Sequence, residues 1–257
     1  MRGLAFRESL KRVIRSDDWE RLGIPTHKLI MEAMENGRMQ DAAELLEYLG
    51  MEGKSLHDLY CDWIWDMLTK VAQVYGEEKV YWVCRETQGT WMLKRTWKAM
   101  VRMPVEDRVF ITAEILRSHR CGPLQDGSLE VRDEGIRISL KMDPCGSGGR
   151  MRRGDPIAGT PSRLGPPYNF GVTQKAYPWS WGMVGVPYYC VHCAVNEILP
   201  TEWGGYPLWV TGFSLDAEDP CYWFFYKRPE DIPDCFFERI GFSKKERSLI
   251  WTRIPKN

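Results

Sequence analysis

The chain has 257 residues, of which 44% are hydrophobic and 27% are charged, as in a globular protein with a packed core. Its 35 basic and 35 acidic residues balance, and neither half carries the basic excess that nucleic-acid binding requires. No apolar run reaches the ~18 residues of a membrane span, and the charged N-terminus lacks an apolar signal core. These features predict a cytoplasmic protein with a small-molecule partner and neither nucleic-acid nor membrane binding, and they leave the oligomeric state open.

Helical periodicity dominates the first half of the chain. Apolar residues recur every three or four positions, and proline, glycine and capping residues mark the segment ends. The predicted helices cover residues 5–16, 25–34, 39–49, 55–75, 77–100 and 105–119. We therefore expect the first 122 residues to form a helical bundle.

The pattern changes after Gly122. Residues 129–132 and 136–140 alternate apolar and polar side chains around an Asp-Glu-Gly turn, which predicts a β-hairpin. Farther on, residues 190–199 have helical spacing that Pro200 should end. Two aromatic segments, residues 208–213 and 222–226, are expected to form strands.

These patterns predict an α+β fold. We expect a helical bundle over residues 1–122, packed on a small mixed α+β domain over residues 123–227 with a Cys-rich metal centre. A C-terminal extension over residues 228–257 completes the chain.

A long Pro/Gly-rich loop is expected over residues 154–178. Loops of this length in a compact domain are usually functional or disordered. Tyr168, Phe170 and Tyr177 give this one apolar side chains to bury. Two interpretations stay open: a lid over the cysteine centre described next, or a mobile surface connection.

Four cysteines in the second half have distinctive local settings. Cys145 and Cys221 each follow an Asp-Pro pair, while Cys190 and Cys193 form a C-x-x-C that contains His192. Thiolates bind zinc or iron far better than they bind hard cations. We predict a metal centre with the ligands Cys145, Cys190, Cys193 and Cys221. Zinc is the first choice, and iron or an iron–sulfur cluster is the second.

Two other interpretations of these cysteines remain open: buried structural thiols, and a redox-active C-x-x-C. The ligand set is open as well, because His192 or His57 could replace one cysteine. His57 lies four residues before Cys61, a spacing that lets two side chains on a helix meet one ligand. We therefore take His57 and His192 as candidate catalytic residues, although a polar helix edge would also explain His57.

Candidate substrate-binding residues flank the loop. Arg150, Arg152 and Arg153 follow the Gly-rich stretch after Cys145, and Arg150 and Arg153 could hold a carboxylate or phosphate. A solvated basic turn is the alternative. Trp179 and Trp181 could line an apolar ligand pocket, or they could simply fill the core.

The cysteine motifs also carry a family resemblance. Asp143-Pro144-Cys145-Gly146-Ser147-Gly148, Tyr189-Cys190-Val191-His192-Cys193 and the segment from Asp219 to Lys227 resemble an uncharacterised bacterial family with a helical N-terminal half. The last segment is also similar to L-2-amino-thiazoline-4-carboxylate hydrolase-like proteins, and the cysteine layout to vinyl-4-reductase-like domains. These resemblances imply an α+β domain that handles a small organic molecule, and they transfer no catalytic residue.

The function expected from these patterns is that of a metal-dependent hydrolase or lyase. Zinc would polarise a small organic substrate, for which an anionic group is one option, or activate a bound water. One alternative is a non-catalytic binding protein or sensor with a structural four-cysteine zinc site. Another is an iron–sulfur or redox protein.

Overall fold

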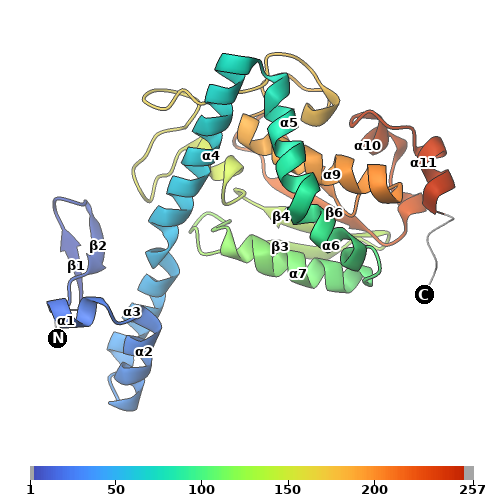
Figure 1. The fold of residues 1–257 in the computed structure, drawn as a ribbon. Coiled ribbons are helices and arrows are strands. Elements are labelled where there is room, and N and C mark those ends of the chain that lie inside the picture. The colour runs from blue at the N-terminus through green and yellow to red at the C-terminus, as the bar shows by residue number, and fades with distance from the viewer. Residues whose placement is uncertain (1–2, 252–257) are drawn as a thin grey trace. The chain divides into compact units, whose positions relative to one another are not determined.

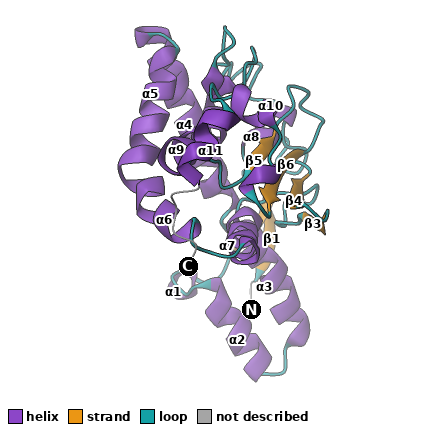
Figure 2. Cartoon of the chain, turned by 90° about the vertical axis from the view of Figure 1, so that its right-hand side faces the viewer, coloured by secondary structure: helices purple, strands orange, loops and turns teal. Residues whose placement is uncertain are grey.

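The computed structural model describes residues 3–251 (Figures 1 and 2). The chain divides into two compact units, an N-terminal unit that ends at Leu59 and a C-terminal unit that starts at Tyr60. Both contain helices and strands, which confirms the α+β class. Among the described residues, no helix is long and apolar enough to cross a membrane.

The N-terminal unit begins with a β-hairpin, so the helix predicted over residues 5–16 is wrong. Strands β1 (Leu4–Arg7) and β2 (Arg12–Arg15) pair antiparallel. Leu10 and Val13 have helical spacing, but Leu10 lies exposed in the turn and Val13 is exposed on β2. The strands have four residues each, so their alternation is too short to stand out against that spacing.

The rest of the N-terminal unit is helical. It contains α1 (Trp19–Leu22), α2 (Thr26–Glu35), α3 (Met39–Glu52) and the start of α4 (Lys54–Tyr75). Helices α2 and α3 pack through a small core that includes Leu29, Ala33 and Leu45. Three of the predicted helices are thus confirmed in this region, with ends within a few residues of those expected.

The C-terminal unit holds the remaining helices. They are α5 (Glu78–Thr87), the π-helical turn η1 (Gln88–Met92), α6 (Leu93–Met100), α7 (Val105–Ser118), α8 (Gly148–Arg153), α9 (Val191–Gly204), α10 (Asp234–Glu238) and α11 (Lys244–Trp251). Three short 3-10 turns accompany them: η2 (Pro178–Ser180), η3 (Tyr188–Cys190) and η4 (Pro229–Asp231). The helix predicted over residues 77–100 is present, but the π-helical turn interrupts it.

One four-stranded antiparallel sheet anchors this unit, in the order β3-β4-β6-β5. Its strands are β3 (Glu130–Asp133), β4 (Arg137–Met142), β5 (Val210–Gly212) and β6 (Cys221–Tyr226). On one face Leu140 and Phe225 pack against α7, and on the other Val210 and Tyr226 pack against Phe237 of α10. The predicted hairpin is therefore correct, and both of its aromatic partner strands join the same sheet.

Helix α9 lies between the sheet and α5, so the unit is layered as sheet, α9 and α5 (Figure 2). Val191, Val195 and Ile198 of α9 are buried. Pro200 was expected to end this helix, which instead continues to Gly204. A proline inside a helix costs about 3 kcal/mol, but burial of the apolar residues around it outweighs that cost.

The divisions of the chain differ from those expected. The helices from α5 to α7 belong with the sheet, because the boundary falls after Leu59 rather than after residue 122. The predicted C-terminal extension is part of the same unit as far as it is described. Phe237 of α10 is fully buried and contacts Trp251 at the end of α11.

The long loop over residues 154–178 lies along α4. The Trp65 indole donates a hydrogen bond to the Gly171 carbonyl at 2.8 Å, and the Gly171 amide donates to the Thr69 hydroxyl at 2.8 Å. Arg163 is almost fully buried and forms an ion pair with Asp62 at 2.9 Å. These contacts hold the loop against α4.

Candidate functional site

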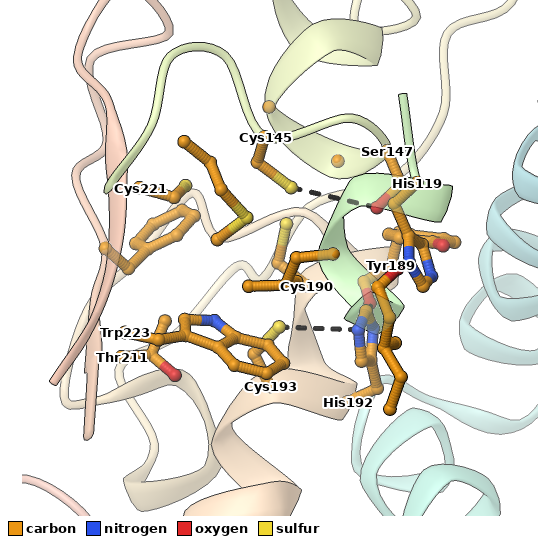
Figure 3. A pocket seen from close by; sticks show the side chains of 16 residues that line it. His119, Cys145, Ser147, Tyr189, Cys190, His192, Cys193, Thr211, Cys221 and Trp223 are labelled. Carbon is orange, nitrogen blue, oxygen red and sulfur yellow. Dashed lines mark hydrogen bonds between the residues drawn. The ribbon is translucent and has the colours of Figure 1, made fainter. Parts of the chain in front are cut away.

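The four predicted cysteine ligands line one cavity of about 70 Å³ in the C-terminal unit. Its wall includes Met142, Cys145, Ser147, Gly148, Gly149, Tyr189, Cys190, His192, Cys193, Thr211, Phe213, Cys221 and Trp223, with Ile115, Leu116 and His119 at the end of α7. In Figure 3 the sulfur atoms of Cys145, Cys190 and Cys221 point toward one space, and Cys193 lies beside His192. The cavity has room for a few water-sized groups, which excludes a large substrate inside it.

Three chain segments bring the cysteines together. Cys221 opens β6 and pairs in register with Met142 at the end of β4. Cys145 follows β4 after a two-residue connection, in the turn that leads into α8. Cys190 and Cys193 belong to the turn η3 and the first turn of α9. The sequence prediction that the four cysteines converge therefore agrees with their positions.

Glycines in the turn after Cys145 allow this approach. A Cβ on Gly146 would lie 1.5 Å from the His119 carbonyl oxygen, so the turn can pass the end of α7 only without a side chain. A Cβ on Gly148 would lie 2.6 Å from the Cys190 sulfur. A side chain at either glycine would clash with these atoms and move the turn away from the cavity.

Of the four cysteines in the cavity wall, Cys145 is the one whose surroundings favour the negatively charged thiolate. Its pKa is held well below the ordinary thiol value by a hydrogen bond from the Cys221 thiol, and by the Gly149 and Ser147 amides and the Ser147 hydroxyl. These hydrogen bonds outweigh burial, which acts in the opposite direction. Hydrogen bonds to the charged form of a group favour that form, so Cys145 is the thiolate of the site.

The other three cysteines hold their protons. The hydrogen bond to Cys145 and burial raise the pKa of Cys221, and burial raises the pKa of Cys190 to about 12. Burial also raises the pKa of Cys193 well above its ordinary value. These opposite shifts of pKa favour a single negative charge, on Cys145, when no metal is bound.

His192 is set as a neutral acceptor beside Cys193. Its Nδ1 lies 2.5 Å from the Tyr189 carbonyl oxygen, which can only accept, so Nδ1 carries the proton. The Nε2 atom then accepts from the Cys193 thiol at 3.3 Å. Burial lowers the pKa of His192, which favours the neutral ring that this pattern needs.

Arg152, which we did not single out from the sequence, supplies positive charge near the cysteines. It is 3% exposed, and its electrostatic effect lowers the pKa of both Cys190 and Cys221. Its Nη1 donates to the Ser214 carbonyl at 2.9 Å, while Nε and Nη2 have no hydrogen-bond partner within residues 3–251. Nor does any carboxylate in that range form an ion pair with it. A run of three arginines after a Gly-rich turn gave no indication of which one turns inward.

Arg150 and Arg153, which we predicted to bind an anionic group of a substrate, instead bind groups of the protein itself. The Arg150 guanidinium is fully buried and donates to Asp155 at 2.9 Å and to the Gly146 carbonyl. Arg153 donates to the Asp143 carboxylate at 2.8 Å and to the backbone carbonyls of Ala217 and Glu218. Both line a separate open depression and not the cysteine cavity. Their contacts brace the Gly-rich turn.

None of the other predicted site residues is among those that line this cavity. Trp179 stacks between Tyr177 and Tyr81, and the Trp181 indole donates to the buried Glu197 at 3.1 Å, so both tryptophans are core residues. His57 lies in the N-terminal unit, with Nδ1 3.1 Å from an Asp58 oxygen. Its catalytic role stays a prediction.

The lid prediction for the loop is wrong. None of the residues 154–178 lines the cysteine cavity. Ion pairing and hydrogen bonding to Asp62, Trp65 and Thr69 hold the loop on α4 instead.

The cysteines do not surround a single point. Within residues 3–251, no group of three or more His, Cys, Asp or Glu side chains is placed to hold a single metal ion. Zinc needs its sulfur ligands about 2.3 Å from one centre. The four cysteines instead lie in the wall of one cavity.

Cys145 should react first with a thiol reagent in protein free of metal. At pH 7, iodoacetamide should alkylate Cys145 at least about tenfold faster than Cys193, because the thiolate is the nucleophile. Both side chains are half-buried, which makes Cys193 a matched control for access. Cys145 should lose this advantage as the pH falls through its lowered pKa. Mass spectrometry of quenched samples measures both rates, and equal rates at pH 7 would contradict the assignment.

Comparison of the chain with protein families, curated proteins and solved structures finds no match, so the resemblances noted from the motifs stay predictions.

Proposed function

We propose that Cys145, Cys190, Cys193 and Cys221 hold one iron–sulfur cluster and that the protein works in electron transfer. The observation that carries the proposal is the set of four cysteines, from three chain segments, that line one small cavity. Four cysteine thiolates are the usual ligands of [2Fe–2S] and [4Fe–4S] clusters.

The size of the space favours a cluster over zinc. A single zinc ion draws four sulfurs toward one point and leaves no room between them. A cluster spreads several iron atoms and sulfides over a larger volume, so its cysteines border a cavity. A space of about 70 Å³ lined by all four cysteines agrees with the second arrangement.

The surroundings suit a negatively charged sulfur-rich group. Amide hydrogen bonds from Ser147 and Gly149 reach the Cys145 sulfur, and the buried Arg152 adds a cation without a carboxylate partner in the described chain. Met142, Phe213 and Trp223 exclude water from the wall. Hydrogen bonds to sulfur, nearby charge and burial are the features by which proteins tune cluster potentials.

The number of ligands favours electron transfer over hydrolysis. When bound, the group would supply one-electron oxidation and reduction. With four cysteines as ligands, no position stays open for water or substrate, and a Lewis-acid role needs such a position. The hydrolase or lyase function predicted from the sequence would require one cysteine to stay unbound.

Anaerobic reconstitution tests the proposal. Protein treated with ferrous iron and sulfide should develop a broad visible absorption near 400 nm that dithionite bleaches, and zinc should compete for the same thiols. If zinc binds at one equivalent and iron with sulfide leaves the protein colourless, the site is a zinc site and the electron-transfer proposal fails.

A further inference from the structure

A second cavity of about 490 Å³ lies in the C-terminal unit between α4, α5 with η1, and α9. Its volume is within the range of small-molecule pockets, about 300–1,000 Å³. Apolar side chains such as Met67, Val71 and Val83 make up most of its wall, and no Lys, Arg, Asp or Glu is among the lining residues. A charged ligand would therefore lose its hydration there without gaining an opposite charge.

Two buried amide side chains line this cavity without a partner. Gln88 is 5% exposed and Asn196 is 9% exposed. Gln88 Oε1 and Asn196 Oδ1 are buried, and neither has a hydrogen-bond partner among residues 3–251. An unpaired buried polar atom costs about 1–3 kcal/mol, so two in one wall indicate that a donor from outside the chain pairs with them.

The backbone around Gln88 has an unusual form. Gln88 begins the π-helical turn η1, which interrupts the helix between α5 and α6. Single π-helical turns inside helices are rare and often lie at functional sites, because they change which side chains face inward. This turn places Gln88 in the cavity wall together with Met92 at its other end.

We propose that this cavity, which we call the amide pocket, binds a neutral organic molecule with an apolar ring or chain and one hydroxyl or N–H group. The apolar body packs against α4 and α5, the hydroxyl or N–H group donates its one proton to the Gln88 oxygen, and water donates to the Asn196 oxygen. The proposal goes beyond electron transfer and does not depend on a cluster.

The amide pocket and the cysteine cavity are neighbours. His119, Tyr189 and His192 line both. A ligand in the amide pocket would therefore lie beside three side chains that also line the cysteine cavity. Such a position is suited to a molecule whose reaction or release depends on the state of the cysteine site.

The test uses 2-naphthol as the probe, because it is an apolar ring system with one hydroxyl and is neutral at pH 7. 2-Methylnaphthalene has nearly the same shape without the donor, and 2-naphthoate carries a charge. Equilibrium dialysis of the full chain, without added metal, should show saturable binding of 2-naphthol. The other two compounds should bind at least about tenfold more weakly.

Matched variants locate the binding. Val71→Trp fills the pocket and should reduce 2-naphthol binding at least about tenfold. Val74→Trp, on the same helix at a position that is 68% exposed and outside the lining, should leave it unchanged. Met67→Trp is a second filling variant at a half-exposed position, in case Val71→Trp disturbs folding. Gln88→Met should abolish the preference for 2-naphthol over 2-methylnaphthalene.

The outcomes separate this proposal from the iron–sulfur proposal. Binding that is lost in both filling variants supports the pocket, whether or not the protein ever takes up iron. Lack of saturable binding below about 1 mM, or equal binding by the wild-type and both filling variants, would overturn it. Gln88 and Asn196 would then be paired with water alone.

Discussion

Replacing any one of Cys145, Cys190, Cys193 or Cys221 by serine should lower the iron content of anaerobically reconstituted protein at least about tenfold, because a serine hydroxyl is a poor ligand for iron in a cluster. The effect should be similar at all four positions, since each cysteine borders the same cavity. Iron analysis and visible absorption of the purified variants measure it.

Two other cysteines provide controls. Cys84 is buried but lies outside the cysteine cavity, and Cys235 is exposed. Cys84→Ser and Cys235→Ser should retain the iron content of the wild-type protein. If the four variants keep their iron, or if the control variants lose it equally, the assignment of these four ligands is wrong.

The second large effect concerns a buried ion pair of α9, the helix that carries Cys193. The Glu197 carboxylate on α9 is fully buried and accepts hydrogen bonds from Arg239 at 2.8 Å and from the Thr211 amide at 2.9 Å. Arg239→Met should lower the free energy of unfolding by about 3–5 kcal/mol, because it leaves a buried carboxylate without its cation. The melting temperature should fall by about 6–20 °C for a unit of this size.

A surface pair serves as the control for that variant. Arg228 bonds Asp231 at 2.7 Å, but its side chain is 71% exposed. Arg228→Met should therefore change the free energy of unfolding by less than about 1 kcal/mol. The double variant Glu197→Gln with Arg239→Met should recover part of the loss, since it removes the buried charge. Equal melting temperatures for the two single arginine variants would contradict this account of the ion pair.

Local patterns predicted much of the C-terminal unit. Alternation on either side of Gly135 identified strands β3 and β4, and the aromatic run after Cys221 identified β6. The signals of β4 and β6 were readable because these strands pack Leu140 and Phe225 against α7 and space their apolar residues accordingly. Strand β3 is largely exposed, and the Asp-Glu-Gly turn before β4 identified it. The convergence of the cysteines could be anticipated because all four lie at junctions between elements.

Features that depend on packing were not predictable. Arg150, Arg152 and Arg153 are close in sequence and chemically alike. Arg150 and Arg152 are both buried, yet it is Arg152 that lowers the pKa of Cys190 and Cys221, because packing decides which buried guanidinium lies near the cysteines. Trp179 and Trp181 flank a loop as pocket residues would, but they fill the core. The π-helical turn at Gln88 leaves no signal in the helical periodicity, so the amide pocket was missed.

The domain boundary shows the same limit. Predicted helices follow one another from residue 25 to residue 119, and periodicity alone does not reveal which helices pack together. Trp65 and Leu68 of α4 belong to the core that includes α9, whereas Leu29 and Leu45 belong to a separate core. Only those contacts place the division near the start of α4.

The most direct test of the central claim is the content of iron and acid-labile sulfide in protein purified from cells without exposure to air and without reconstitution. The account predicts iron and sulfide in equal amounts, about four of each per chain for [4Fe–4S] or about two of each for [2Fe–2S]. About one zinc per chain, or less than one iron per roughly five chains with all four thiols open to alkylation, would contradict it.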